Sequence, residues 1–332
     1  MKALVTGAAG FIGQKICKSL LNDGHKVLAI DSINPYYSTD LKRVRISELL
    51  ESNESNSFSF IEADICEDRA VKEVELFKPE TIFHFAAQPG VRLGLGGLRQ
   101  YSHDNIEAFL TVLNLAINLD VEKFLYASSS SVYGRQSTVP FSELEEKLFP
   151  ASIYGVTKLA NELFISTVTE SKVKCRGLRF FSVYGPNGRP DMAYFRAIGA
   201  ALLDLPFYKN GSGEVARDFT FISDVSESVL DLERELGNRP AGSKDIVNIG
   251  GGSPVKINEL LSIIEEVTGK SINVLPKDSV KEDLNITEAN YDYLENLTGK
   301  DKFVEIQNGI EQTVRWFLNH PIGKIEKWID QS

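Results

Sequence analysis

The chain has 332 residues, of which 42% are apolar and 25% are charged. This length and composition suit one large globular domain, or two unequal ones, with a sizeable core. The net charge of −10 argues against nucleic acid or an anionic membrane as a partner, because both require a basic surface.

Cysteine usage and hydropathy predict a cytoplasmic protein. The three cysteines, Cys17, Cys66 and Cys175, are far apart and odd in number, so they offer neither a disulfide framework nor the spacing of a metal site. We therefore expect buried thiols and no bound metal. The sequence contains no run of 18 apolar residues, and its first residues lack the regions of a signal peptide.

From residue 3 to residue 181, short apolar runs rich in Val, Ile and Phe alternate with amphipathic stretches of helical period. The runs lack a polar alternate face, as expected of strands covered on both sides. This alternation predicts an α/β fold with a Rossmann-type doubly wound parallel sheet. The expected strands are 3–6, 27–30, 58–63, 81–85, 124–128 and 175–181, and the expected helices are 14–21, 69–77, 105–119 and 154–168.

After Phe181 the pattern loosens into glycine- and proline-rich segments at 185–190 and 210–213. We interpret them as part of a smaller, loop-rich α/β domain that closes over the carboxyl edge of the sheet, where ligands of open α/β sheets bind. The larger domain is predicted to comprise 1–181 plus about 222–250, and the smaller one 182–221 plus 251–332. Three further helices are expected at 257–268, 289–297 and 310–318.

The turn after the first expected strand carries three glycines at a spacing of three: Gly7, Gly10 and Gly13. Glycines in such a strand-to-helix turn let the backbone approach a pyrophosphate, while the helix amino terminus faces its negative charge. They can also be purely structural. The second strand ends in Asp31, whose carboxylate can accept hydrogen bonds from the adenosine ribose and would repel a 2′-phosphate. The sequence therefore predicts NAD, bound by the turn residues Gly7, Gly10, Phe11, Ile12 and Gly13 together with Asp31.

Two further strand ends fall where the adenine and pyrophosphate of such a cofactor would lie. Asp64 and Ile65 follow the third strand, and Ala86 and Ala87 follow the fourth. For each pair, a purely structural role is as reasonable as a cofactor contact.

Tyr154 and Lys158 are four residues apart, which on a helix places both on one face. An adjacent ammonium stabilises a phenolate and lowers the tyrosine pKa from its usual value of about 10, and the lysine can also hold the nicotinamide ribose. A solvated helical pair has the same spacing. The fifth strand ends in four serines, 128–131, whose hydroxyls can reach a sugar oxygen or simply form a polar loop.

Together these features resemble the extended short-chain dehydrogenase/reductase family, from Met1 to about Leu318. The resemblance implies that Tyr154 is the acid/base and that Lys158 tunes it. It also implies that Ser129, four residues before the tyrosine of Val132-Tyr133-Gly134, hydrogen-bonds the reacting hydroxyl.

Within that family the chain is similar to NAD-dependent sugar-nucleotide epimerases, and most of all to UDP-glucuronate 4-epimerases. The similar stretches are 31–37, 41–43, 86–92 and 179–193. The resemblance implies 4-epimerisation of a UDP-sugar through a transient 4-keto intermediate, with NAD regenerated in each cycle. With glucuronate this intermediate would lose carbon dioxide unless its carboxylate were held. Arg189 is the expected partner, because a guanidinium can clamp a carboxylate bidentately; a surface arginine beside a proline turn is the alternative.

The resemblance also assigns the rest of the substrate site. Ser130, Ser182 and Arg92 are expected beside the sugar. Phe207 and Tyr208 match a uracil-contacting strand, although they could equally be core residues, and Arg217 matches a diphosphate-binding arginine. The family's second diphosphate arginine is missing before Glu282-Asp283-Leu284, where Lys277 or Lys281 could substitute.

The same comparison separates sibling reactions. Relatives that dehydrate carry an Asp-Glu pair after the catalytic hydroxyl, and those that decarboxylate carry a Glu before Val-Tyr-Gly, whereas this chain has Ser130 and Ser131. Two alternatives stay open: a 4-epimerase of a neutral UDP-hexose or UDP-N-acetylhexosamine, and a non-catalytic NAD(H)-binding regulatory protein.

A homodimer is expected from two apolar helical stripes, which could instead face the sheet. The stripes are Ile106, Phe109, Leu110, Leu113 and Ile117 on one helix, and Leu159, Leu163 and Val168 on the other.

Overall fold

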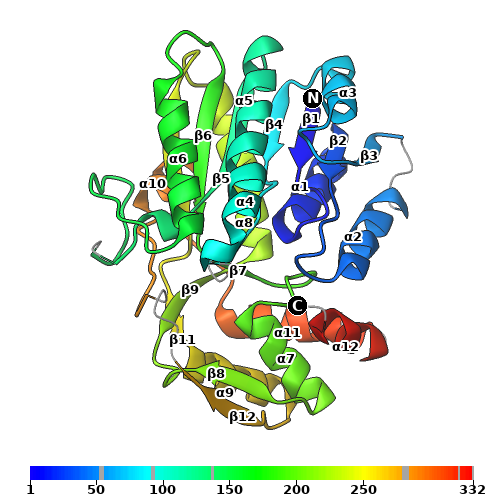
Figure 1. Cartoon of the computed structure of the whole chain (residues 1–332). Helices are drawn as coiled ribbons and strands as arrows, with labels where there is room; N and C mark the ends of the chain where they lie inside the picture. Colours follow the sequence, from blue (N-terminus) through cyan, green and yellow to red (C-terminus); the bar gives the residue numbers. More distant parts are fainter. Residues whose placement is uncertain (52–55, 91–93, 136–137, 279–283, 321, 331–332) are drawn as a thin grey trace.

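A seven-stranded sheet forms the centre of the computed structural model, which describes residues 1–51, 56–90, 94–135, 138–278, 284–320 and 322–330 (Figure 1). The strand order is β10-β6-β5-β4-β1-β2-β3, and every neighbouring pair is parallel. The predicted doubly wound parallel sheet is therefore confirmed. The strands are β1 (Lys2–Thr6), β2 (Lys26–Asp31), β3 (Phe58–Glu62), β4 (Thr81–His84), β5 (Lys123–Ser129), β6 (Lys174–Phe180) and β10 (Lys244–Ile249).

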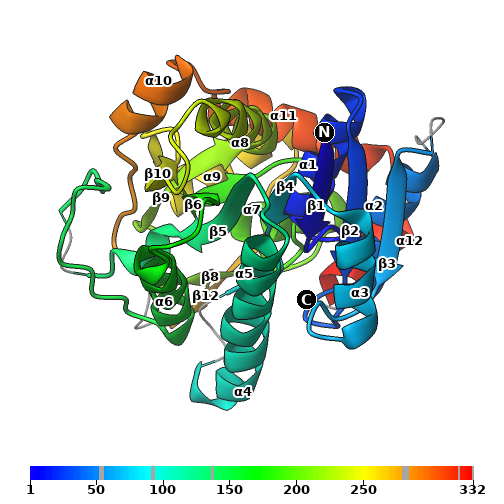
Figure 2. The same cartoon turned by 90° about the horizontal axis from the view of Figure 1, so that it is seen from above.

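Helices cover both faces of this sheet, as the view from above shows (Figure 2). Alternate strand residues point to opposite faces, so Leu4, Ile82 and Phe124 pack with α3, α5 and α6. Their neighbours Ala3 and Phe83 pack on the other face, with α1 and α8. The helices are α1 (Phe11–Asn22), α2 (Thr39–Glu51), α3 (Asp68–Phe77), α4 (Leu98–Tyr101), α5 (Ala108–Asn118), α6 (Ile153–Thr167), α7 (Ala193–Leu203), α8 (Ile222–Gly237), α9 (Ile257–Thr268), α10 (Asp292–Thr298), α11 (Ile306–Leu318) and α12 (Ile322–Asp330).

A smaller lobe lies at the carboxyl ends of the strands of the large sheet, at the bottom of Figure 1. It contains a three-stranded sheet, β11-β9-β7, and a two-stranded parallel sheet, β12-β8, flanked by α7, α9, α11 and α12. Its strands are β7 (Ser182–Tyr184), β8 (Phe207–Asn210), β9 (Ala216–Phe221), β11 (Pro254–Lys256) and β12 (Val274–Lys277). The division of the chain into two domains at the residues given above stays a prediction.

The two lobes share one hydrophobic cluster. Phe180 of the large sheet, Val183 and Phe221 of the small sheet, and Phe195 and Phe317 of the surrounding helices all belong to it. Because this packing is continuous, it fixes the position of the smaller lobe at the carboxyl ends of the large sheet's strands.

Several helices were absent from the sequence prediction, and α2 shows why. It buries Lys42 and Arg45, so its inward face has no continuous apolar stripe for a periodicity argument to find. The expected helix 105–119 is interrupted at its start, since 102–107 form a π-helix before α5. Within the described part of the chain, no helix is long and apolar enough to span a membrane.

Candidate active site

A cleft of about 660 Å³ lies between the two lobes, and its walls come from both. All the site residues predicted from the sequence line this one cleft, except Arg92, which lies outside the described residues. They are Gly7, Gly10, Phe11, Ile12, Gly13, Asp31, Asp64, Ile65, Ala86, Ala87, Ser129, Ser130, Tyr154, Lys158, Ser182, Arg189, Phe207, Tyr208 and Arg217.

The glycine turn between β1 and α1 leaves no room for side chains. A Cβ on Gly7, whose φ is +71°, would lie 2.6 Å from the Ala86 nitrogen, and one on Gly13 would lie 2.2 Å from the Gly7 oxygen. The turn thus brings bare backbone to the cleft directly before Phe11, where α1 begins. This cradle fits a dinucleotide pyrophosphate, which needs close backbone approach and a helix amino terminus.

Asp31, at the end of β2, lies beside this turn. Its carboxylate accepts hydrogen bonds from the Ala9 nitrogen at 3.0 Å and the Ile33 nitrogen at 2.8 Å. A residue that the sequence left without a role lies close to it: Lys42 of α2 lines the cleft, and its Nζ donates to the backbone and side-chain oxygens of Asn34, each at 2.7 Å. Burial lowers the pKa of Lys42 to about 8.

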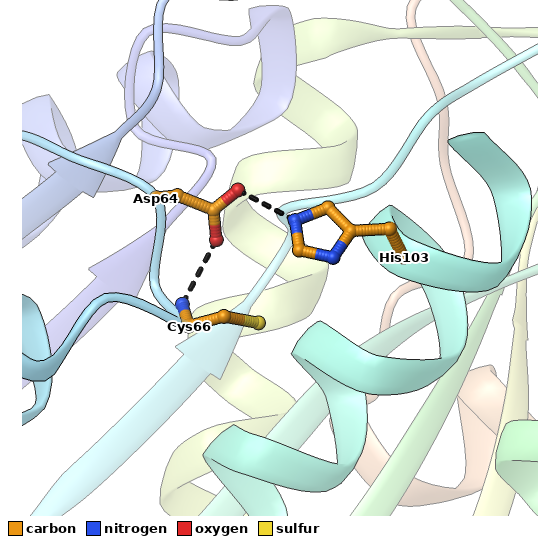
Figure 3. Close-up of side chains that lie close together, drawn as sticks. All are labelled: Asp64, Cys66 and His103. Carbon is orange, nitrogen blue, oxygen red and sulfur yellow. Dashed lines mark hydrogen bonds and ion pairs between the residues drawn. The ribbon is translucent and has the colours of Figure 1, made fainter. Parts of the chain in front are cut away.

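Asp64, after β3, is held in an ion pair (Figure 3). Its Oδ2 lies 2.8 Å from His103 Nε2, and Glu107 binds Nδ1 of the same imidazole at 2.8 Å. The two carboxylates raise the pKa of His103 to about 9.

Cys66 completes a group of three side chains of metal-ligand type, whose ligand atoms lie within 4.8 Å of one another. Burial raises the pKa of the Cys66 thiol to about 11, which disfavours the thiolate that a metal requires. A protonated imidazole between two carboxylates accounts for the arrangement.

Ser129, Tyr154 and Lys158 meet at the carboxyl end of β5. Tyr154 and Lys158 lie on one face of α6, whose first turn is capped by the Ser152 hydroxyl. The Ser129 hydroxyl lies close enough to that of Tyr154 to act on the pKa of the tyrosine, and Lys158 Nζ donates to the Ala127 carbonyl at 2.9 Å.

Burial raises the pKa of Tyr154, while the charge of Arg189 and the nearby Ser129 hydroxyl act in the opposite direction. The Lys158 ammonium donates to the Ala127 carbonyl and lies 5.8 Å from the centre of the tyrosine ring. That Lys158 tunes Tyr154 stays a prediction. Burial also lowers the pKa of Lys158 to about 8.

Asn105 supports the catalytic helix, and the sequence analysis missed it. The side chain is buried, accepts from the Gln88 nitrogen at 2.7 Å, and donates to the Thr157 hydroxyl at 2.9 Å. It thereby joins the π-helix, the loop after β4 and the first turns of α6. A single asparagine inside an apolar helical pattern gave no signal for this role.

Arg189 also lines the cleft, in the segment between β7 and α7. Its Nε and Nη2 donate to the two carboxylate oxygens of Asp191, at 3.0 and 2.6 Å. The edge of the guanidinium best suited to a bidentate clamp therefore already faces Asp191.

Phe207, Tyr208, Arg217 and Lys277 line the part of the cleft formed by the smaller lobe. Phe207 is buried whereas Tyr208 is about half exposed, so the two adjacent side chains have different surroundings. Arg217 Nη1 donates to the carbonyls of Ala216 and Leu284 at 2.8 Å. Lys281 lies outside the described residues.

Residues 3–250 match the model of the NAD dependent epimerase/dehydratase family, and the chain belongs to this family. It is 35% identical to UDP-glucuronate 4-epimerase of Thermodesulfobacterium geofontis over 316 residues, 94% of this chain and 95% of that one.

Solved structures agree with the family. The UDP-glucuronic acid 4-epimerase of Bacillus cereus, in complex with UDP-glucuronic acid and NAD, superposes with a TM-score of 0.88 at 32% identity, covering 98% of this chain and 100% of that one. MoeE5 in complex with UDP-glucose and NAD gives a TM-score of 0.83 at 30% identity, covering 96% and 99%. MoeE5 is also known in complex with UDP-glucuronic acid.

The protein is accordingly an NAD-dependent enzyme of the sugar-nucleotide epimerase family. This membership excludes the non-catalytic regulator considered from the sequence. It does not select the sugar.

Proposed function

We propose that the chain is a UDP-glucuronate 4-epimerase that converts UDP-glucuronate to UDP-galacturonate through a 4-keto sugar. The observation that carries the choice of an acidic sugar is the position of Arg189. This cation lines the cleft and acts electrostatically on Tyr154. The proposed acid/base and a group able to bind a carboxylate therefore belong to one site.

The residues at the end of β5 and on α6 supply the proton chemistry. Tyr154 takes the proton of the sugar 4-hydroxyl and later returns it, while Ser129 holds the same oxygen and keeps it aligned with the tyrosine. Bound NAD supplies the hydride acceptor and donor. Gly7, Gly10 and Gly13 hold its pyrophosphate, Asp31 its adenosine ribose, and Lys158 its nicotinamide ribose.

Arg189 and Ser182 are assigned to the sugar carboxylate, and Ser130 to the sugar beside it. Because Asp191 occupies the Nε edge of Arg189, the sugar carboxylate either approaches another edge of the guanidinium or displaces Asp191. A held carboxylate cannot align with the C4 carbonyl, which protects the β-keto acid against loss of carbon dioxide. Phe207 and Tyr208 are assigned to the uracil, and Arg217 with Lys277 to the diphosphate.

The Arg189–Asp191 pair also supports a second candidate, a 4-epimerase of a neutral UDP-hexose or UDP-N-acetylhexosamine. The pair is close to neutral overall, which reduces the attraction of the site for a second carboxylate.

Turnover of UDP-glucuronate, UDP-glucose and UDP-N-acetylglucosamine, with product analysis, tests the choice of sugar. We expect UDP-glucuronate to have the highest kcat/KM. Faster turnover of either neutral sugar would overturn the proposal in favour of the second candidate.

Substitution of Arg189 gives a sharper test. We expect Arg189→Met to lower kcat/KM about 100-fold for UDP-glucuronate, the worth of a charge-assisted hydrogen-bond pair. Loss of the Arg189 charge also changes the electrostatics of Tyr154, and this effect is the same for every substrate. The quantity to compare is therefore the ratio of the loss in kcat/KM with UDP-glucuronate to the loss with a neutral UDP-sugar. Equal losses with acidic and neutral sugars would show that Arg189 does not bind the carboxylate.

A further inference from the structure

A buried ion pair lies directly behind the catalytic residues and is not part of the proton chemistry proposed above. Arg179 of β6 donates from Nε and Nη2 to the two carboxylate oxygens of Glu162 on α6, at 2.9 and 2.8 Å. Both side chains are almost completely buried, with exposed fractions of 3% and 4%. Burying two charges carries a large desolvation cost, so such a pair is weak evidence for stability alone.

The pair is connected to the catalytic strand through one hydroxyl. Ser128 Oγ donates to Glu162 Oε1 at 2.5 Å, and Ser128 is the residue before Ser129. Ser128 and Arg179 also face each other in the register between β5 and β6. The carboxylate therefore fixes the end of β5 from two sides, through a serine and through the neighbouring strand.

Glu162 also continues the catalytic face of α6. Tyr154, Lys158 and Glu162 are spaced by four residues, so all three point to the same side of the helix. Lys158 holds the Ala127 carbonyl and Glu162 holds the Ser128 hydroxyl, so α6 is attached to two consecutive residues of β5. In the proposed function Lys158 must also reach the nicotinamide ribose, which leaves Glu162 as the attachment between α6 and β5 that does not contact the cofactor.

We propose that Glu162, fixed by Arg179, is a positioning residue that holds the end of β5 through Ser128, so that the Ser129 hydroxyl stays beside that of Tyr154. This inference rests on the proposed roles of Ser129 and Tyr154. The consequence is that loss of the single Ser128–Glu162 hydrogen bond impairs the catalytic pair while the ion pair remains intact.

Ser128→Ala tests the proposal without uncovering a buried charge. We expect kcat to fall about tenfold, because small misplacements of reacting groups are costly, with KM and NAD content unchanged. The pKa of Tyr154 should rise as the Ser129 hydroxyl moves away from the phenol. This pKa is measured from the absorbance of the phenolate as a function of pH and requires no substrate. The absorbance of the corresponding Tyr154→Phe derivative is subtracted from that of each protein.

Ser228→Ala is the matched control. Ser228 is fully buried on α8, and its hydroxyl has no hydrogen-bond partner among the described residues. This variant loses a buried hydroxyl as well, and we expect an unchanged kcat and an unchanged Tyr154 pKa.

Glu162→Gln, compared with Asp245→Asn, separates positioning from stability. Asp245 pairs with Arg176, another buried arginine of β6, at 2.5 and 2.7 Å. Each variant removes a carboxylate from a buried arginine and should lower the free energy of unfolding, although Arg176 keeps Glu235 as a partner at 2.7 Å. Only Glu162→Gln should lower kcat and raise the Tyr154 pKa.

A Ser128→Ala enzyme with parental kcat and parental Tyr154 pKa would overturn the positioning role. If the parent itself turned over no UDP-sugar, the proposed function would fail, whereas the Tyr154 titration would still decide the positioning role.

Discussion

Single residues in this site carry a measurable cost for the fold, and Lys158 is the clearest case. Its side chain is buried, and burial lowers its pKa to about 8 from 10.5. A buried lysine with a lowered pKa destabilises the folded chain, because the unfolded chain binds the proton more tightly. The residue is thus placed for the reaction at the expense of stability.

The sign of the pH dependence follows from these two pKa values. Below pH 8 both states hold the proton and the full penalty applies. Between about pH 8 and pH 10.5 the folded state releases it first, so the penalty fades as the pH rises. With bound nucleotide removed from both proteins, we expect Lys158→Met to have the larger free energy of unfolding at pH 7, by up to about 3 kcal/mol. Urea unfolding at pH 7 and pH 10 should show this advantage shrinking; an advantage that grew with pH would contradict the assignment.

At the scale of elements, the turn between β1 and α1 and the turn after α1 allow a controlled comparison. Gly7 and Gly24 both have a positive φ, +71° and +77°. A Cβ on Gly7 would meet the backbone of Phe85 and Ala86 within 2.8 Å, whereas nothing lies within 4 Å of one on Gly24. The two positions therefore share the backbone strain but not the clash.

We expect Gly24→Ala to lower the free energy of unfolding by about 1 kcal/mol, the usual cost of a left-handed alanine, and to retain NAD. Gly7→Ala should be less stable than Gly24→Ala and should lose the cofactor, because the backbone of Phe85 and Ala86, directly after β4, must move away from the turn. Urea unfolding and the nucleotide content of the purified proteins measure both effects. A Gly7→Ala protein with parental NAD content would show that the turn does not need its close approach to the segment after β4.

Strands β1 to β6 and the helices α1, α3, α6, α9 and α11 follow from the hydrophobic pattern of the sequence. Strand β10 of the same sheet was not among the expected strands. Helix α2 does not follow from this pattern, since Arg45 is fully buried there and donates to the Ala9, Asn187 and Gly188 carbonyls. This guanidinium joins the glycine turn to the segment before Arg189, which is a tertiary arrangement that local sequence cannot express.

The candidate site, too, contains tertiary contacts that local sequence could not predict. Local motifs pointed to Gly7, Asp31 and Tyr154 because each has a recognisable spacing, whereas Ser129 was singled out from four consecutive serines only by the family resemblance. Asn105 and Glu162 act through partners 52 and 34 residues away, and the occupation of Arg189 by Asp191 depends on a loop conformation. Long-range pairing and loop geometry, not residue type, determine these contacts.

At the scale of the whole molecule, the outer face of α5 and α6 carries exposed apolar side chains. Of the stripes expected from the sequence, Phe109 and Leu113 are buried in the core beneath α5, so that part faces the sheet. Leu110 is 39% exposed, and Leu163 is 58% exposed on the outside of α6. Val156, one heptad before Leu163 on the same helix, is 54% exposed. The two helices lie side by side on one surface (Figures 1 and 2).

We propose that this outer face of α5 and α6 pairs with itself across a two-fold axis, because isologous dimers bury the same patch on both subunits. Sedimentation at micromolar concentration should then show a dimer, and Leu163→Glu should shift it to a monomer, since the dimer would bury an unpaired carboxylate. Leu144→Glu is the matched control: Leu144 is 89% exposed and belongs to neither α5 nor α6, so its variant should remain dimeric. A monomeric parent, or a Leu163→Glu protein that stays dimeric, would refute the pairing. Because Val156 and Leu163 share α6 with Tyr154 and Lys158, a dimer through this face would pack the two catalytic helices against each other.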